Sequence, residues 1–248
     1  MGRTVSVTGM ILTASPIKEY DRRIEILTRE RGRISAFAQG ARRANSTLSA
    51  CTIPFTFGEF TLYEGRNSYN VQSAVIQKFF GDIAQDYDMT CYASYFAEMA
   101  QHFTRENMEA SQELLLLYVT LLAMQSRRIP LPLIRVIYEM RLMMIEGQSL
   151  ELFECLGCHK MNTRTVYFAA GGLVCEDCAG KEKELEKSYP FVLSKDALHS
   201  LQYILTAPLE KLYSFLVTEE VQKELEHFMK AYLGRYLPHQ FKAAAFLE

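Results

Sequence analysis

Residues 155–178 read CLGCHKMNTRTVYFAAGGLVCEDC, and their two Cys-x-x-Cys pairs, Cys155/Cys158 and Cys175/Cys178, decide how this part of the chain folds. Two such knuckles at this separation can place four thiolates at the corners of a tetrahedron around one zinc ion. Four sulfur ligands saturate the metal and leave no position for a water molecule, so the expected site is structural and not catalytic. The sequence therefore predicts one structural zinc ion, held by a knuckle insertion at residues 151–179.

The same four cysteines have other interpretations. A redox-active dithiol pair or a pair of disulfides would use the same residues. A redox role usually needs one Cys-x-x-Cys motif beside a βαβ pattern, and the sequence shows no such pattern. His159 follows a ligand directly, but a tetrahedral site does not need a fifth donor. A metalloenzyme would require an open coordination position, which four cysteine ligands deny.

Towards the N-terminus from this knuckle, the first eighty residues show the period-two alternation of β-strands. Strands are expected at residues 3–8, 24–28, 33–38, 55–63 and 69–75. The connections leave no room for crossover helices, and a small antiparallel barrel would remove the exposed strand edges. Five strands favour an OB fold over a sandwich, and an SH3-like barrel fits the pattern nearly as well. We therefore predict a basic, OB-fold-like barrel at residues 1–79.

After the barrel the period changes to that of α-helices, and residues 80–248 are expected to form a helical domain. An aromatic stripe at residues 79–99 is expected to open it, and we interpret this stripe as core and not as a stacking platform. Further helices are predicted at residues 112–125, 133–145, 196–205 and 219–232, with a break at Pro130 and Pro132 and N-caps at Ser194 and Thr218. The fold class is thus α+β: an OB-like barrel, then helices with an inserted four-cysteine knuckle.

The formal net charge of −2 conceals a basic N-terminal part. Residues 1–70 contain ten Lys and Arg against six Asp and Glu, and nine of the ten cations are Arg. Arginine binds phosphate through two hydrogen bonds and stacks on bases, so the distribution indicates a polyanion partner for the barrel. A solvated charged face has the same composition. The candidate phosphate-binding residues are Arg22, Arg23, Arg31, Arg33, Arg42, Arg43 and Arg66. The candidate stacking residues are Tyr20 and Tyr69, each of which also fits a rim or core position.

Motifs of catalysis are missing from the sequence. It has no Walker phosphate loop, no dinucleotide-binding glycine motif and no nucleophile elbow, and its five histidines are scattered. We therefore expect a binding protein and not an enzyme. No signal peptide is visible, and the longest apolar run, at residues 114–124, is too short to span a bilayer. Cys51 and Cys91 fit buried free thiols, so a cytoplasmic protein without a membrane partner is expected.

The order of these parts resembles the RecO family of bacterial DNA repair and recombination mediators. Residues 19–34 (EYDRRIEILTRERGRI) are similar to the family's opening hairpin, residues 39–43 (QGARR) to its Gly-Ala-Arg loop, and residues 60–66 (FTLYEGR) to the following strand and turn. The two cysteine pairs resemble the zinc-bearing branch of the family. The tail at residues 243–247 (AAAFL) departs from the family, whose members tend to have a serine before the final Phe-Leu.

The resemblance implies an OB fold that binds single- and double-stranded DNA and anneals complementary strands, in the bacterial cytoplasm at the nucleoid. It also implies partnership with RecR and with the acidic C-terminal tail of single-stranded-DNA-binding protein, which helps to load RecA onto the coated strand. The competing class is a protein-interaction adaptor that has a structural zinc knuckle and no direct role on DNA. A steep salt dependence is expected of the DNA binder and not of the adaptor.

For the acidic tail we expect a site in the helical domain, because an acidic peptide with an apolar end needs cations beside a pocket. The candidate cations are Arg128, Arg135 and Arg141, and the helix they surround is rich in Leu133, Ile134, Tyr138 and Leu142. Surface cations that flank a buried stripe are the alternative interpretation.

Overall fold

The computed structural model describes residues 2–66, 68–182, 185 and 189–247, and it divides into two compact units. Unit 1 consists of Met1–Gln125 together with Phe241–Glu248, and unit 2 is Ser126–Gln240. The chain therefore leaves unit 1 and later returns to it. This grouping follows packing, and the division into domains at residue 79 stays a proposal.

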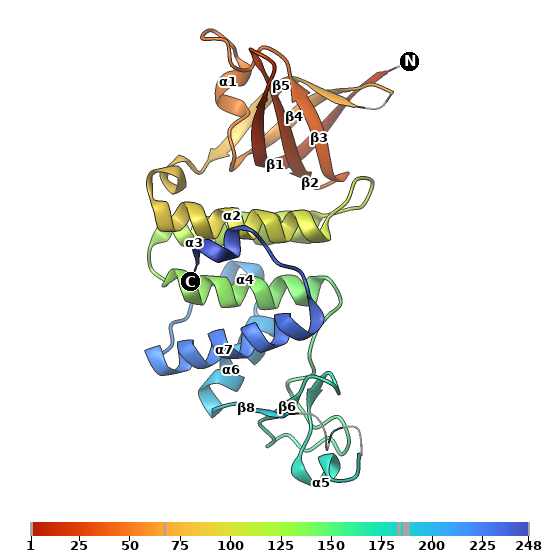
Figure 1. The fold of residues 1–248 in the computed structure, drawn as a ribbon, viewed down its shortest axis with the longest axis vertical. Helices are drawn as coiled ribbons and strands as arrows, with labels where there is room; N and C mark the ends of the chain where they lie inside the picture. Colours follow the sequence, from red (N-terminus) through yellow and green to blue (C-terminus); the bar gives the residue numbers. More distant parts are fainter. Residues whose placement is uncertain (1, 67, 183–184, 186–188, 248) are drawn as a thin grey trace. The chain divides into compact units, whose positions relative to one another are not determined.

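Five strands form a closed barrel in unit 1 (Figure 1). They are β1 (Arg3–Ile17), β2 (Asp21–Thr28), β3 (Gly32–Ala38), β4 (Thr56–Glu64) and β5 (Tyr69–Phe79). Their order around the barrel is β1-β2-β3-β5-β4, and the pairs are antiparallel except for a short parallel contact between β3 and β5. The predicted five-stranded, OB-like barrel is confirmed, and its closure removes most of the free edges.

Burial alternates along β3 and along most of β4. In β3, Ile34, Ala36 and Ala38 are buried, whereas the residues between them are half-buried. Strand β1 extends beyond the predicted residues 3–8. The sequence pattern does not reveal this extension, because residues 9–12 are all buried and so lack the period-two alternation of a strand. A register shift between Ile11 and Thr13 then adds an irregularity that the sequence pattern does not reveal.

Between β3 and β4 the chain forms an exposed loop and then the short helix α1 (Leu48–Cys51). Leu48 and Cys51 belong to the apolar core of the barrel, so α1 contributes to that core. Cys51 is therefore the buried free thiol that the sequence predicts. Cys91 is buried and free as well.

The rest of unit 1 is helical: η1 (Gly81–Gln85), α2 (Tyr87–Phe103), α3 (Ser111–Ser126) and η3 (Ala243–Phe246). Phe79 ends β5 and Phe80 precedes η1, so the first two members of the predicted stripe are not helical, and the α-helical part begins only after the N-cap Asp86. Its later members, such as Tyr95 and Phe96, are buried, as the core interpretation predicts. The segment at residues 241–247 packs on α2, where the ring of Phe241 meets Tyr95 edge-on at 5.6 Å between centroids.

Unit 2 is built from α4 (Leu131–Ile145), α6 (Lys195–Thr206) and α7 (Glu219–Tyr236), with η2 (Leu209–Lys211) between the last two. Pro130 and Pro132 stand at the start of α4, where a missing N–H costs little, so they begin this helix. The preceding helix has already ended at Ser126, before Arg127 with its positive φ of 54°. The predicted caps are confirmed: the side chains of Ser194 and Thr218 accept from the backbone of the first turns of α6 and α7.

A three-stranded sheet joins the knuckle region to these helices, in the order β7-β6-β8. Its strands are β6 (Thr165–Tyr167), β7 (Gly172–Leu173) and β8 (Phe191–Val192), and the short helix α5 (Glu176–Ala179) follows β7. Among the described residues, no helix is both long and apolar enough to cross a membrane.

Candidate metal centre and nucleic-acid interface

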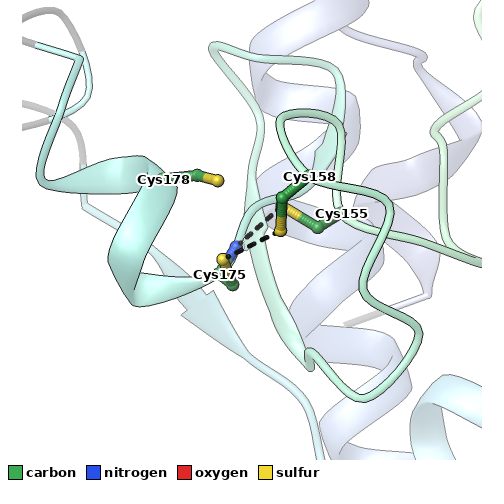
Figure 2. Close-up of side chains that lie close together, drawn as sticks. All are labelled: Cys155, Cys158, Cys175 and Cys178. Carbon is green, nitrogen blue, oxygen red and sulfur yellow. Dashed lines mark hydrogen bonds between the residues drawn. The ribbon is translucent and has the colours of Figure 1, made fainter.

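The four cysteines of the two knuckles converge on one point in unit 2. Their Sγ atoms all lie within 4.8 Å of one another. Figure 2 shows the side chains of Cys155 and Cys158 approaching from the first knuckle and those of Cys175 and Cys178 from the second, at the start of α5. Cys155 is buried and Cys158 is exposed, while the other two thiols are half-buried. This set of four sulfur donors can hold a metal ion.

The local fold of the knuckles explains the convergence. The antiparallel pair β6–β7 turns the chain back, and the Leu156 N–H donates to the Leu173 carbonyl at 2.9 Å, so the two knuckles lie together. Gly157 is needed for the close approach, because a Cβ at this position would stand 2.9 Å from the Sγ of Cys178. Lys160 and Asp177, both exposed, form an ion pair of 2.8 Å between the two knuckles, and the surrounding solvent screens it.

Backbone N–H groups prepare Cys155 for ionisation. Burial opposes the thiolate, but the N–H groups of Cys175 and Gly157 point at its Sγ, at 3.3 and 3.4 Å, and the pKa of Cys155 falls to about 6. The neighbouring thiols of Cys175 and Cys158 raise the pKa of Cys178 to about 12. Four thiolates this close together repel one another, so complete ionisation requires a bound cation.

His159 lies outside the set of four converging donors. Its Nδ1 pairs with a carboxylate oxygen of Glu154 at 2.7 Å, and this hydrogen bond raises the pKa of His159 above its usual value. The expectation that four sulfur atoms suffice for the metal stays a prediction.

The first candidate nucleic-acid surface combines the loop after β3 with the turn between β1 and β2. The Arg42 N–H donates to the Tyr20 carbonyl at 2.9 Å, and the Gly40 N–H donates to a carboxylate oxygen of Asp21 at 2.8 Å. The guanidinium of Arg43 lies over the ring of Tyr20, with 5.3 Å from Cζ to the ring centroid. The structure therefore brings the exposed residues Tyr20, Arg42 and Arg43 together.

The second candidate surface is the outer face of β2 and β3. Arg23 and Phe37 are cross-strand partners, and the Arg23 Nε donates to the Ser35 Oγ at 2.9 Å. A hollow of about 410 Å³ is lined by Arg23, Phe37, Arg66 and neighbouring residues, including the carboxylates of Glu64 and Glu106. Phe37 was not among the predicted stacking residues. The signal that could have found it is the alternation of residues 33–38, which turns an aromatic ring outward beside Ser35.

Three other predicted arginines are engaged by contacts within unit 1. Arg22 donates to the Ser49 carbonyl at 2.8 Å and to the Thr52 Oγ at 3.0 Å. Arg31 donates to a carboxylate oxygen of Glu64 and to the Tyr69 hydroxyl, both at 3.0 Å. Arg33 donates to a carboxylate oxygen of Glu25 at 3.1 Å and to the Thr104 carbonyl at 3.2 Å. Tyr69 is 6% exposed and belongs to the barrel core, so its ring is not available for stacking on a base.

The three predicted cations of unit 2 are in different surroundings. Arg128 is exposed. Arg135 pairs at 2.7 Å with Glu139, whose side chain is only 2% exposed. Arg141 donates to the carbonyl groups of Ile204, Leu205 and Ala207 at 2.7–2.9 Å and so caps the C-terminal end of α6.

The apolar residues that were expected to form a pocket beside these cations are core residues. Leu133, Ile134, Tyr138 and Leu142 are fully buried, because the apolar stripe of α4 is the side by which the helix packs. Sequence reasoning did not find a groove of about 640 Å³ in unit 2, whose lining includes Tyr203, Phe215, Leu216 and Val221.

Comparisons with known proteins cover almost the whole chain. The family model described as "Recombination protein O N terminal" matches residues 1–80, and the one described as "Recombination protein O C terminal" matches residues 84–245. The DNA repair protein RecO of Acetivibrio thermocellus is 31% identical over 98% of this chain and 96% of its own length. The proteins of the same name from Alkaliphilus metalliredigens and Caldicellulosiruptor saccharolyticus are 27% and 25% identical, over 94% and 98% of this chain and equal shares of their own lengths.

Proposed function

The chain belongs to the RecO family of DNA repair proteins, and from this premise we propose that it is a non-enzymatic mediator that binds single- and double-stranded DNA and anneals complementary strands. The proposal includes a cytoplasmic location at the nucleoid, partnership with RecR, and help in loading RecA onto DNA coated by single-stranded-DNA-binding protein. The observation that supports it best is the position of the exposed arginines and aromatic rings on the barrel.

In an OB fold, the face of strands 2 and 3 and the loops between strands 1 and 2 and strands 4 and 5 bind oligonucleotides. In this chain the same positions carry Arg23 and Phe37 on the strands, Tyr20 in the first loop and Arg66 in the second. Arg42 and Arg43, in the loop after β3, contact Tyr20 and so lie beside the first loop. We infer that these side chains form the DNA path, with the arginines on phosphates and the rings of Phe37 and Tyr20 against bases.

Annealing on this surface needs no covalent chemistry. Two polyanionic strands repel each other, and arginine side chains that displace their counterions lower this repulsion. The aromatic rings give each base a sequence-tolerant contact, so the protein is expected to bind strands without sequence preference over roughly 4–16 nucleotides per barrel.

The engaged arginines have a supporting role in this proposal. Arg22 holds α1 through the Ser49 carbonyl. Arg31 holds the start of β5 through the Tyr69 hydroxyl, and Arg33 holds the segment at Thr104. We propose that they maintain the shape of the DNA path and reach phosphate only if their protein contacts open.

We further propose that the four-cysteine cluster holds one zinc ion. The Sγ atoms are close enough for tetrahedral ligation, and backbone N–H groups stabilise the thiolate of Cys155. The ion would balance the charge of the thiolates and hold the two knuckles together, so its contribution would be to the folding of unit 2.

The acidic tail of single-stranded-DNA-binding protein is proposed to bind unit 2. Arg128 is the candidate cation that the structure leaves exposed, whereas Arg135 and Arg141 would have to combine this role with their contacts to Glu139 and to the end of α6. Because the stripe of α4 is buried, the apolar end of the tail needs another pocket.

Strand annealing by the purified protein, measured with a salt titration of DNA binding, tests the function. If four exposed arginines neutralise phosphates, the slope of log K against log salt is about −3 on single strands. Annealing of complementary oligonucleotides above the spontaneous rate is the second expected result. A protein that binds neither DNA form at low salt would be the adaptor, and the DNA proposal would be rejected.

A further inference from the structure

The hollow on the outer face of β2 and β3 contains acidic groups that a phosphate-binding surface does not need. Its lining includes the carboxylates of Glu64 and Glu106 beside the exposed side chains of Arg23 and Arg66. A carboxylate repels the phosphates of DNA, so phosphate binding by the arginines does not account for the two acids. At about 410 Å³, the hollow lies in the size range of clefts that bind small molecules.

The two carboxylates differ in what they already bind. Glu64 accepts from Arg3 at 2.8 Å and from Arg31 at 3.0 Å, so its charge is balanced. Glu106 is exposed, and no ion pair of Glu106 with a cation is found in the described part of the chain. Burial, and then the neighbouring Glu106, raise the pKa of Tyr69. An ionised carboxylate has about four acceptor positions, so Glu106 can accept further hydrogen bonds beside this hydroxyl.

The loop that carries Glu106 is fixed to the turn between β2 and β3. The Asn107 N–H donates to the Arg31 carbonyl at 3.0 Å. Gly32 permits the close approach: its φ is +64°, and a Cβ at this position would collide with the Arg105 carbonyl oxygen. A binding group needs such support from its surroundings to keep one position. The barrel therefore holds Glu106 at the hollow.

An acceptor together with an aromatic ring matches one part of a DNA strand, which is an unpaired base. The ring of Phe37 offers a stacking surface, and the Glu106 carboxylate can accept from an exocyclic amino group. Cytosine, adenine and guanine carry such an amino group. Thymine and uracil have a carbonyl oxygen at the position of the cytosine amine, and a carboxylate repels it. A base inside a duplex stays in its stack, so only an unpaired base can enter.

We propose that this hollow is a base-binding site, in which Phe37 stacks on one unpaired base and Glu106 accepts a hydrogen bond from the exocyclic amino group of that base. The site rests on the proposed function and adds to it a base preference at one nucleotide. Arg23 and Arg66 bind phosphates of the same strand. The other nucleotides on the barrel are bound without preference, so the preference is small in mixed sequences and largest in homopolymers.

Titration of the full-length protein with single-stranded oligomers of deoxycytidine and of deoxyuridine tests the proposal. At position 4 of the ring, cytosine has the amino group and uracil the carbonyl oxygen. Fluorescence anisotropy gives the dissociation constants for oligomers longer than the roughly 4–16 nucleotides of one barrel. The wild type should prefer deoxycytidine, and Glu106→Ala should lower the ratio of the two constants about fivefold, because one charge-assisted hydrogen bond is lost.

The affinity for deoxyuridine separates this effect from misfolding. Glu106→Ala removes a negative charge, so it should bind the deoxyuridine oligomer at least as tightly as the wild type, whereas a misfolded variant would lose both oligomers. Glu109→Ala removes the same charge from the same loop and is the matched control, since Glu109 bonds Ser111 at 2.8 Å and should leave the ratio unchanged. Phe37→Leu should weaken the binding of both oligomers about tenfold, because a stacking ring is lost.

The possible results separate the base site from the proposed function. A protein that binds neither oligomer at low salt fails the proposed function, and the base site with it. If both oligomers bind and Glu106→Ala keeps the wild-type ratio, the proposed function stands and the base site is overturned. A Glu109→Ala variant that lowers the ratio as much as Glu106→Ala, or a Phe37→Leu variant with wild-type affinity, overturns it as well.

Discussion

Arg22 and Arg23 are neighbours in β2, and their guanidinium groups serve opposite purposes in the barrel. Arg22 donates to the Ser49 carbonyl and the Thr52 hydroxyl and so holds α1, whereas Arg23 donates to Ser35 on the outer face beside Phe37. Successive residues of a strand point to opposite sides, so a single step along the chain separates a structural arginine from a candidate DNA contact.

This relationship predicts two different losses. Arg22→Ala should lower the free energy of unfolding by about 1.5–3 kcal/mol, because hydrogen bonds from a charged group to α1 are lost. Arg23→Ala should change it by about 0.5 kcal/mol or less and should instead weaken DNA binding. Urea unfolding and DNA titration of both variants separate these effects. Equal stability losses in the two variants would contradict the assignment.

Replacement of Arg42 and Arg43 together by Ala should weaken binding to all DNA sequences similarly. The slope of log K against log salt should become shallower by about 0.7 per lost contact on single strands and about 0.9 on duplex. Arg127→Ala with Arg128→Ala in unit 2 removes the same charge and is the matched control, which should keep the wild-type slope. An unchanged slope in the Arg42 and Arg43 variant would place this loop off the DNA path.

Cys175→Ser should release the metal and destabilise unit 2, since structural zinc binding is worth about 10–16 kcal/mol in apparent terms and much of it becomes folding energy. The DNA affinity should fall less than the thermal stability, because the proposed DNA path lies in unit 1. Elemental analysis and thermal unfolding measure both effects. Cys91→Ser is the control and should retain the metal. Wild-type protein without zinc, with its thiols paired as disulfides, would refute the zinc site.

Glu64 should contribute to the loss of stability in acid. Hydrogen bonds from Arg3 and Arg31 hold the pKa of the Glu64 carboxyl below its usual value, so the stability that they confer is present above about pH 4.5 and is lost as the pH falls through the lowered pKa. The unfolding temperature of Glu64→Gln should therefore fall less than that of the wild type between pH 6 and pH 3. Glu59→Gln is the control, because Glu59 bonds Ser6 and no arginine contact of Glu59 is found among the described residues.

Arg128→Ala should weaken binding of a labelled acidic tail peptide about tenfold, on the order of 1.4 kcal/mol, without a loss of stability. Arg135→Ala should lower stability as well, because it leaves the buried carboxylate of Glu139 without this partner. Calorimetric titration of the peptide, with an unfolding curve for each variant, tests both. Equal peptide binding by the wild type and a variant that lacks Arg128, Arg135 and Arg141 would reject this site.

The features that the sequence predicts well are local ones. The cysteine knuckles are defined by spacings of two residues, and the caps Ser194 and Thr218 each act within the first turn of their own helix. The five strands are recognisable wherever one face is buried and the other is not. The extension of β1 to Ile17 was missed because its buried run at residues 9–12 has no alternation to detect.

The residues of the candidate DNA surface were harder to predict, because their roles depend on distant partners. Nothing in the sequence near Arg31 indicates that Glu64 and Tyr69, more than thirty residues away, will bond it. Phe37 shows the opposite case, a surface residue that the sequence does not identify. An aromatic ring in a strand usually indicates a core position, but the ring of Phe37 lines the hollow on the outer face. Composition identified the basic barrel, and only the fold sorts its arginines into surface and scaffold.

The return of residues 241–247 to α2 has a consequence for the order of synthesis. A ribosome makes the barrel and α2 first, then the whole of unit 2, and only afterwards Phe241 and the Ala243 N–H that donates to Glu98 at 2.9 Å. The face of α2 that includes Tyr95 therefore stays uncovered while more than one hundred residues emerge. Nascent-chain folding of unit 1 is therefore expected to reach completion only after unit 2 has been translated.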